Sequence, residues 1–216
     1  MADWVTISAL ASAGGTLVLA GVTVASVRSA NRAARVAEQS LLAAQRPLLV
    51  QSRTDDPLQK VGFHDDVWLY APGGQGAAVA TDEAVYLGIA VRNIGTGIAV
   101  LHGWHLFPAI QLGPDMQPTP LADLTLLTRD LYIAPGDVGF WQGALRDRSS
   151  PDFAEARAAI ETQQRMSVDV LYGDFEGGQR AITRFLLTPR EGEDGVRWIA
   201  TVGRHWNVDR PQPRER

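Results

Sequence analysis

The feature that most limits what this chain can fold into is an uncharged stretch near its start, residues 5–27, which we call the anchor segment. As a helix rising ~1.5 Å per residue, it would reach about 34 Å, enough to cross a hydrocarbon core of roughly 30 Å. Many of its residues are small or hydroxylated, so we expect only marginally favourable insertion into a bilayer. The stretch predicts a single transmembrane helix.

The charges on either side of the anchor segment predict its orientation. Asp3 precedes it without any Lys or Arg, whereas Arg28, Arg32 and Arg35 follow it directly. A cleaved signal peptide has its basic residues on the other side, so it is the weaker alternative. Basic flanks stay inside and attract anionic lipid, which predicts a cell-membrane protein with a cytoplasmic C-terminal domain. An extracytoplasmic domain, or a helix buried in a soluble assembly, is the alternative.

Small residues in the anchor segment recur at intervals of four. This spacing lets two helix backbones approach closely in lipid, although alanine-rich helices also show it by chance. It predicts contact with membrane lipid and with another membrane protein or a second copy of this chain. The residues form two sets, Ala9, Ala13, Gly21 and Ala25, and Ala11 and Gly15.

Residues 28–46 predict a helical connector that continues the anchor segment. They contain strong helix formers and neither glycine nor proline. A narrow apolar stripe along this helix would pack on the protein's own domain or on a second copy. Pro47 lacks the N–H that a helix interior needs, so we expect the helix to stop just before it.

After Pro47 the pattern changes to the alternation of β-strands. Val85, Leu87, Ile89 and Val91 share one face, as in a half-buried strand. Turns at 93–97 and 173–178 should connect neighbouring strands, with glycines supplying positive φ. A helix is expected at 151–164, with Ser150 as its N-terminal cap. Other strands are predicted at 48–52, 98–107, 138–142, 167–172, 181–187 and 196–206.

These elements predict a mainly β fold, an antiparallel sandwich with one inserted helix. The expected organisation is an anchor at 1–27, a connector at 28–46, a β-sandwich domain at 47–206 and a disordered tail at 207–216. Tryptophans on alternating strands are usually core residues, and we expect this of five. They are Trp68, Trp104, Trp141, Trp198 and Trp206.

The segment from Val91 to Ala99 resembles the strand, Asn-x-Gly-x-Gly-x-Ala, strand signature of immunoglobulin-like β-sandwich domains in bacterial surface and membrane proteins. The chain as a whole is similar to uncharacterised bacterial single-pass membrane proteins with such a domain. The likeness covers most of the chain, but its motifs are short and structural, so it implies a fold and no activity. The Cys–Trp–Cys core of antibody-type domains is missing.

Composition removes several classes of function. The net charge is -4 and the pI is near 5.5, so no overall positive field attracts nucleic acid, and we expect no nucleic-acid partner. The chain has no cysteine, which excludes a disulfide scaffold, a thiolate nucleophile and cysteine-based metal sites.

The most varied polar segment is residues 63–70. Its possible interaction residues are His64, Asp65, Asp66, Trp68 and Tyr70. Clustered carboxylates beside a histidine can hold a cation or transfer protons, which motivates a metal-dependent hydrolase as an alternative. Adjacent aspartates are more often solvated turn residues.

His102 and His105 do not predict a metal site, because on a strand they would point to opposite faces. We expect no cofactor and no catalytic residues. The sequence therefore favours a membrane-tethered, non-enzymatic interaction module, such as an accessory subunit of a membrane complex. A membrane-bound ligand-sensing domain is a further alternative.

Overall fold

The computed structural model describes residues 3–193 and 195–209, without the side chains of 4–13, 16–18 and 42–44. The chain divides into two compact units, Met1–Ala44 and Gln45–Arg216. Each unit is described by itself.

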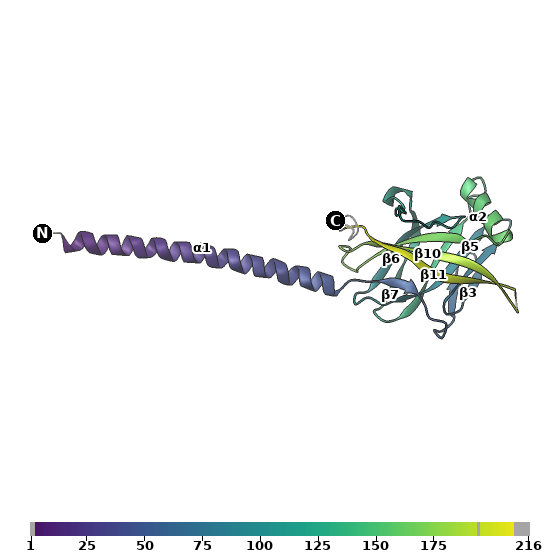
Figure 1. The fold of residues 1–216 in the computed structure, drawn as a ribbon, viewed down its shortest axis with the longest axis horizontal. Helices are drawn as coiled ribbons and strands as arrows, with labels where there is room; N and C mark the ends of the chain where they lie inside the picture. Colours follow the sequence, from purple (N-terminus) through teal and green to yellow (C-terminus); the bar gives the residue numbers. More distant parts are fainter. Residues whose placement is uncertain (1–2, 194, 210–216) are drawn as a thin grey trace. The chain divides into compact units, whose positions relative to one another are not determined.

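The first unit contains a single helix, α1 (Trp4–Ala44), which runs without interruption through the anchor segment and most of the connector (Figure 1). It ends before Pro47, as predicted, because a proline cannot be accommodated in the interior of a helix. In the part of α1 whose side chains are described, no stretch is long and apolar enough to cross a membrane. Residues 5–13 and 16–18 of the anchor segment, including Ala9, Ala11 and Ala13, lie outside that description. Gly15, Gly21 and Ala25 are described and exposed.

The second unit is built of antiparallel strands, which confirms the prediction of a mainly β fold. The elements are β1 (Leu49–Gln51), β2 (Gln59–Gly62), β3 (Trp68–Ala71), β4 (Gln75–Ala80), β5 (Val85–Asn93), β6 (Ala99–Phe107), η1 (Leu121–Asp123), β7 (Thr125–Ile133), β8 (Val138–Leu145), α2 (Pro151–Glu161), β9 (Met166–Gly173), β10 (Ala181–Gly192) and β11 (Gly195–Asn207).

The strands form a sandwich-like arrangement from one curled sheet. One half consists of β8, β5, β4 and β1, and the other of β11, β10, β9, β6 and β7. The halves are joined where Trp198 and Ile199 of β11 pair with Gly76 and Gln75 of β4. Side chains of both halves and of α2 make up the main core. A separate hairpin of β2 and β3 packs on the outer face of β5.

Strand β5 differs from the prediction of a half-buried strand. The face carrying Val85, Leu87, Ile89 and Val91 is buried in the main core, but the opposite face is buried as well. Tyr86 on that face packs against Val61, Phe63 and Leu69 of the hairpin region. The hairpin was not predicted from the sequence, so the second covered face could not be anticipated.

The inserted helix is close to its prediction. The Ser150 side chain accepts a hydrogen bond from the Asp152 backbone N–H, and Pro151 begins α2. Phe153, Ala156 and Ala159 are buried in the main core, and Ile160 packs against it while partly buried. The helix ends at Glu161 rather than 164, and Gln163 has a left-handed φ of 53°.

The turn after Asn93 is not the tight reversal that was predicted. It joins β5 to β6, which do not pair, and neither Gly95 nor Gly97 has a positive φ. These glycines instead allow the incoming chain to lie against the turn. A Cβ on Gly97 would be 1.7 Å from the Gln45 carbonyl oxygen. The turn at 173–178 does connect paired strands, and Gly177 has a φ of 76°.

Asn93 explains the remaining part of the Asn-x-Gly-x-Gly pattern. Its buried Oδ1 accepts hydrogen bonds from the backbone N–H groups of Leu48 (3.2 Å) and Gly95 (3.0 Å). Its Nδ2 donates to the carbonyls of Gly97 (2.7 Å) and Ile133 (3.0 Å). One side chain therefore fixes the start of the domain, the turn and the end of β7.

The first three residues of the predicted disordered tail, 207–209, are ordered. Asn207 still belongs to β11, the Val208 N–H donates to the Arg180 carbonyl (3.0 Å), and Asp209 pairs with the Arg180 side chain (2.7 Å). Residues 210–216 lie outside the described part of the chain.

Candidate functional site

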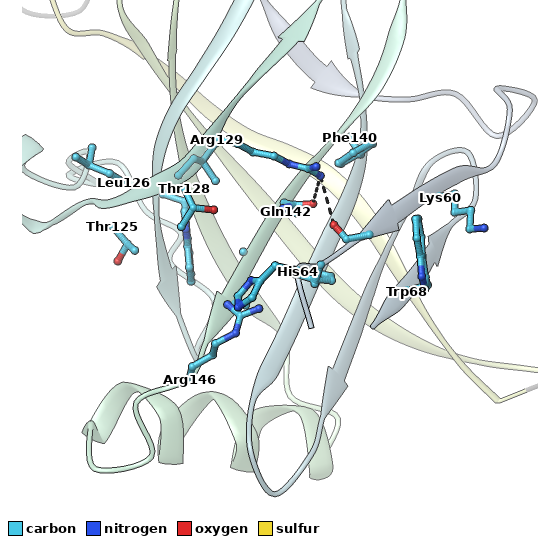
Figure 2. A pocket seen from close by; sticks show the side chains of 16 residues that line it. Lys60, His64, Trp68, Thr125, Leu126, Thr128, Arg129, Phe140, Gln142 and Arg146 are labelled. Atoms are coloured by element: carbon cyan, nitrogen blue, oxygen red, sulfur yellow. Dashed lines mark hydrogen bonds between the residues drawn. The ribbon is translucent and has the colours of Figure 1, made fainter. Parts of the chain in front are cut away.

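The candidate site lies where consecutive strands β7 and β8 separate. The turn at 134–137 joins them, with Gly136 at a φ of 81° and its N–H donating to the Asn93 carbonyl (2.8 Å). Within the described residues the two strands then pair with different partners, β7 with β6 and β8 with β5. A cleft of about 480 Å³ opens between them and the hairpin of β2 and β3 (Figure 2).

An irregularity in β7 places Arg129 across this cleft. Leu131 pairs with Leu101 and Leu126 pairs with Gly103, so residues 127–130 lie opposite His102 alone. Such a bulge redirects side chains away from the regular alternation. The Arg129 Nη2 donates to Gln142 Oε1 of β8 (3.0 Å) and to the Gly62 carbonyl of β2 (3.3 Å), as Figure 2 shows.

The ionisable side chains lining the cleft are basic. They are Lys60, His64, Arg129 and Arg146, and no Asp or Glu is among the described lining residues. Arg146 forms an ion pair with Asp65 at 3.1 Å. Lys60 Nζ lies 4.3 Å above the Trp68 ring. In the described part of the chain, neither Lys60 nor Arg129 pairs with a carboxylate, so the cleft carries uncompensated positive charge.

Apolar side chains flank these charges. Leu126 is 71% exposed and Trp68 is 52% exposed, although residues of these types are usually buried. Phe63 and Phe140 form a deeper part of the wall. The cleft therefore combines positive charge with accessible apolar surface, a combination found at binding sites.

The predicted interaction residues of 63–70 are only partly brought together at this cleft. His64 and Trp68 line it, whereas Asp65, Asp66 and Tyr70 are not among its lining residues. Asp66 occupies a left-handed turn position with a φ of 61°. Tyr70 is exposed on the same face of β3 as Trp68. Trp68 is the one member of the five-tryptophan set that is not buried, because β2 and β3 turn this face to solvent.

Asp65 has a structural role. Its Oδ2 accepts hydrogen bonds from the Tyr86 hydroxyl (2.6 Å) and from Arg146 Nε (3.2 Å) and Nη2 (3.1 Å). Burial alone would raise the pKa of Asp65, but the hydrogen bonds from Tyr86, its own backbone and Arg146, with the Arg146 charge, together lower it. The carboxylate is thus held ionised and attaches the hairpin to β5 and β8.

The histidines of β6 do not form a metal centre with other described residues. No group of three or more His, Asp or Glu side chains in the described ranges is placed to hold a metal ion. His102 lies at the bulge, where burial lowers its pKa. His105 packs edge-on against Phe107, with ring centroids 4.6 Å apart.

Most of the residues that line the cleft were not predicted from the sequence. Leu126 and Arg129 belong to β7, which was not predicted, and Gln142 and Arg146 showed no motif. The available signal was the short strand predicted at 138–142, which located β8 but gave no indication of its unpaired edge.

Comparisons with known proteins give little further information. No protein-family model matches the chain, and no curated protein matches it in sequence. A crystal structure of a protein from Archaeoglobus fulgidus is similar at 13% identity and a TM-score of 0.24, covering 64% of this chain and 95% of that chain. The resemblance to immunoglobulin-like domains of bacterial single-pass membrane proteins stays a prediction.

Proposed function

We propose that the protein is a membrane-tethered, non-enzymatic interaction module that binds its partner in the cleft between β7, β8 and the hairpin of β2 and β3. The observation that carries this proposal is the uncompensated charge of Lys60 and Arg129 beside the exposed Leu126 and Trp68. Basic groups that no described carboxylate neutralises, together with exposed apolar groups, are available to an external partner.

The tether is inferred from the sequence. The anchor segment is uncharged and long enough to span, and Arg28, Arg32 and Arg35 follow it, favouring a cytoplasmic domain. The small residues spaced four apart support contact with another membrane protein or a second copy of the chain within lipid. An accessory subunit of a membrane complex would make both the contact in the cleft and the contact within lipid.

Site-specific photocrosslinking in native membranes tests the proposal. A photoreactive residue at Leu126, in the cleft, should yield a discrete protein adduct. Leu112 is similarly exposed, at 61%, but does not line the cleft, so it provides the matched control. Crosslinks that are equal at both positions, or absent at both, would refute the proposal.

A metal-dependent hydrolase is the alternative that uses residues 63–70. The observation favouring it is the presence of His64 in the cleft near the turn that carries Asp65 and Asp66. The three hydrogen bonds accepted by Asp65 already occupy one of its two carboxylate oxygens, Oδ2. Metal analysis of the purified chain separates the two functions, since stoichiometric metal that is lost in His64→Ala would support the hydrolase.

A further inference from the structure

Building on the proposed function, we propose that the cleft binds an acidic peptide segment of a partner protein in an extended, strand-like conformation. The inference concerns the chemical class of the partner. It rests on the charge of the cleft, on the edges of the strands that border it and on the accessible apolar side chains.

Arg129 carries a positive charge in the cleft that no described carboxylate neutralises. Its guanidinium is held by two neutral oxygens, Gln142 Oε1 and the Gly62 carbonyl. By contrast, Arg92 pairs with Asp56 and Arg180 pairs with Asp209. A guanidinium that is positioned by neutral acceptors keeps its full charge and its remaining N–H donors. It can use them to bind a carboxylate in a fixed planar geometry. Lys60 adds a second free charge on the opposite wall.

Two strands with unpaired edges border the cleft. Among the described residues, β7 pairs only with β6 and β8 pairs only with β5. No backbone hydrogen bond joins residues 125–130 to residues 139–145, both of which are fully described. Unpaired strand edges are templates for an added strand, and main-chain hydrogen bonds then supply affinity independent of the partner's side chains.

The apolar side chains favour a peptide over other anions. An extended peptide alternates its side chains between two faces, so acidic residues can face Arg129 and Lys60 while apolar residues contact Leu126. Inorganic or small organic anions would make no use of these exposed apolar groups. A nucleic-acid backbone would meet a chain of net charge -4.

Fluorescence anisotropy with labelled peptides tests the inference on the full chain in mild detergent. The probe is a peptide of about ten residues that alternates Glu and Val, long enough for one strand. Two matched peptides replace every Glu by Gln, or methylate every second backbone amide. We expect saturable binding of the acidic peptide, and binding at least about tenfold weaker for each matched peptide.

Protein variants identify the site. Arg129→Gln and Lys60→Gln should each weaken binding of the acidic peptide about three- to tenfold, because each removes one free charge. Arg148→Gln is the control, since Arg148 is exposed and does not line the cleft. Lys60 is exposed and its Nζ lies over the exposed Trp68 ring, so Lys60→Gln remains informative if Arg129→Gln disturbs the fold.

Several outcomes would overturn the inference. Equal affinity for the Gln peptide removes the charge requirement, and equal affinity for the methylated peptide removes strand addition. Full displacement by inorganic phosphate would indicate a small-anion site. Arg129-dependent binding to vesicles of phosphatidylglycerol, without peptide binding, would indicate a lipid surface.

Failure of the acidic-peptide proposal can be distinguished from failure of the proposed function. A partner crosslinked at Leu126 but not at Leu112, together with no acidic-peptide binding, would retain the interaction module and reject only the ligand class. Equal or absent crosslinking at the two positions would reject the module itself.

Discussion

At the scale of single residues, one ion pair buried beneath the segment between β6 and η1 stands apart from the others. The side chains of Arg184 and Asp169 are 3% and 0% exposed, with Arg184 Nε 2.5 Å from Asp169 Oδ1. The other carboxylate oxygen also accepts hydrogen bonds from the Thr119 N–H (3.0 Å) and hydroxyl (2.7 Å). The guanidinium lies between the rings of Phe107 and Trp206, 4.5 and 5.0 Å from their centroids. This pair therefore holds the segment around Thr119 against β9 and β10.

Replacing Arg184 with Met should lower the free energy of unfolding by about 3–5 kcal/mol, because Asp169 would stay buried without its partner. Urea denaturation measures this change. Glu161→Gln removes one partner of the exposed Arg157–Glu161 pair and should cost less than about 1 kcal/mol. Similar losses in the two variants would show that burial does not determine the strength of these pairs.

Gly97 tests the explanation of the turn after Asn93. Gly97→Ala should destabilise the domain by about 1–3 kcal/mol, because its Cβ would overlap the Gln45 carbonyl. Gly178→Ala introduces a Cβ with no atom within 4 Å and should change stability by no more than about 0.5 kcal/mol. Thermal unfolding of both variants provides the comparison, and an unaffected Gly97→Ala protein would contradict the close-approach explanation.

At the scale of elements, the hairpin of β2 and β3 depends on its attachment to β5 and β8. Two strands alone are marginally stable in water. Packing of Val61 and Leu69 near Tyr86 and the hydrogen bonds accepted by Asp65 supply that attachment. Since the hairpin forms one wall of the cleft, a detached hairpin would also remove the site.

The pH dependence of this attachment follows from the lowered pKa of Asp65. A group whose folded-state pKa is depressed stabilises the fold fully above its unfolded value, here near 3.8, and that contribution is lost as pH falls through the folded value. The difference in unfolding free energy between wild type and Asp65→Asn should therefore be constant from about pH 7 to about pH 5 and shrink below about pH 4.

Urea denaturation across this pH range measures the difference directly. Subtracting the variant from the wild type cancels the contribution of other carboxylates with lowered pKa values, such as Asp56. A difference that did not change with acidification would show that the Asp65 hydrogen bonds do not stabilise the ionised form.

At the scale of the whole molecule, the two units serve different parts of the proposed function. In that proposal the anchor segment would supply attachment, and the unit from Gln45 onwards would supply recognition. Because the anchor segment contains many small and hydroxylated residues, its insertion should be sensitive to one added charge.

Leu17→Arg places a charge near the middle of the anchor segment and should cost about 2.5–3.5 kcal/mol of insertion free energy. We expect the full chain to sediment with membranes after alkaline carbonate extraction and the Leu17→Arg chain to be released. Val36→Arg lies outside the anchor segment and should remain in the pellet. Wild-type chain recovered entirely in the aqueous fraction would refute the tether.

Local sequence determined the elements that depend on neighbouring residues. Pro47 predicts the end of α1 because its ring cannot enter a helix, and Ser150 with Pro151 predicts the start of α2 through capping. Alternating apolar residues located β5 for the same kind of reason, since the period of two is intrinsic to a strand.

Only the tertiary structure decided which faces and edges remain open. The second face of β5 is buried because the unpredicted hairpin packs on it, and Gly97 is needed because Gln45 lies against it. Arg129 becomes a free cation only because β7 separates from β8 and bulges toward Gln142. Which faces are covered and which edges stay open depends on strand pairing between distant segments. The periodicity of one segment carries no information about the strand that pairs with it.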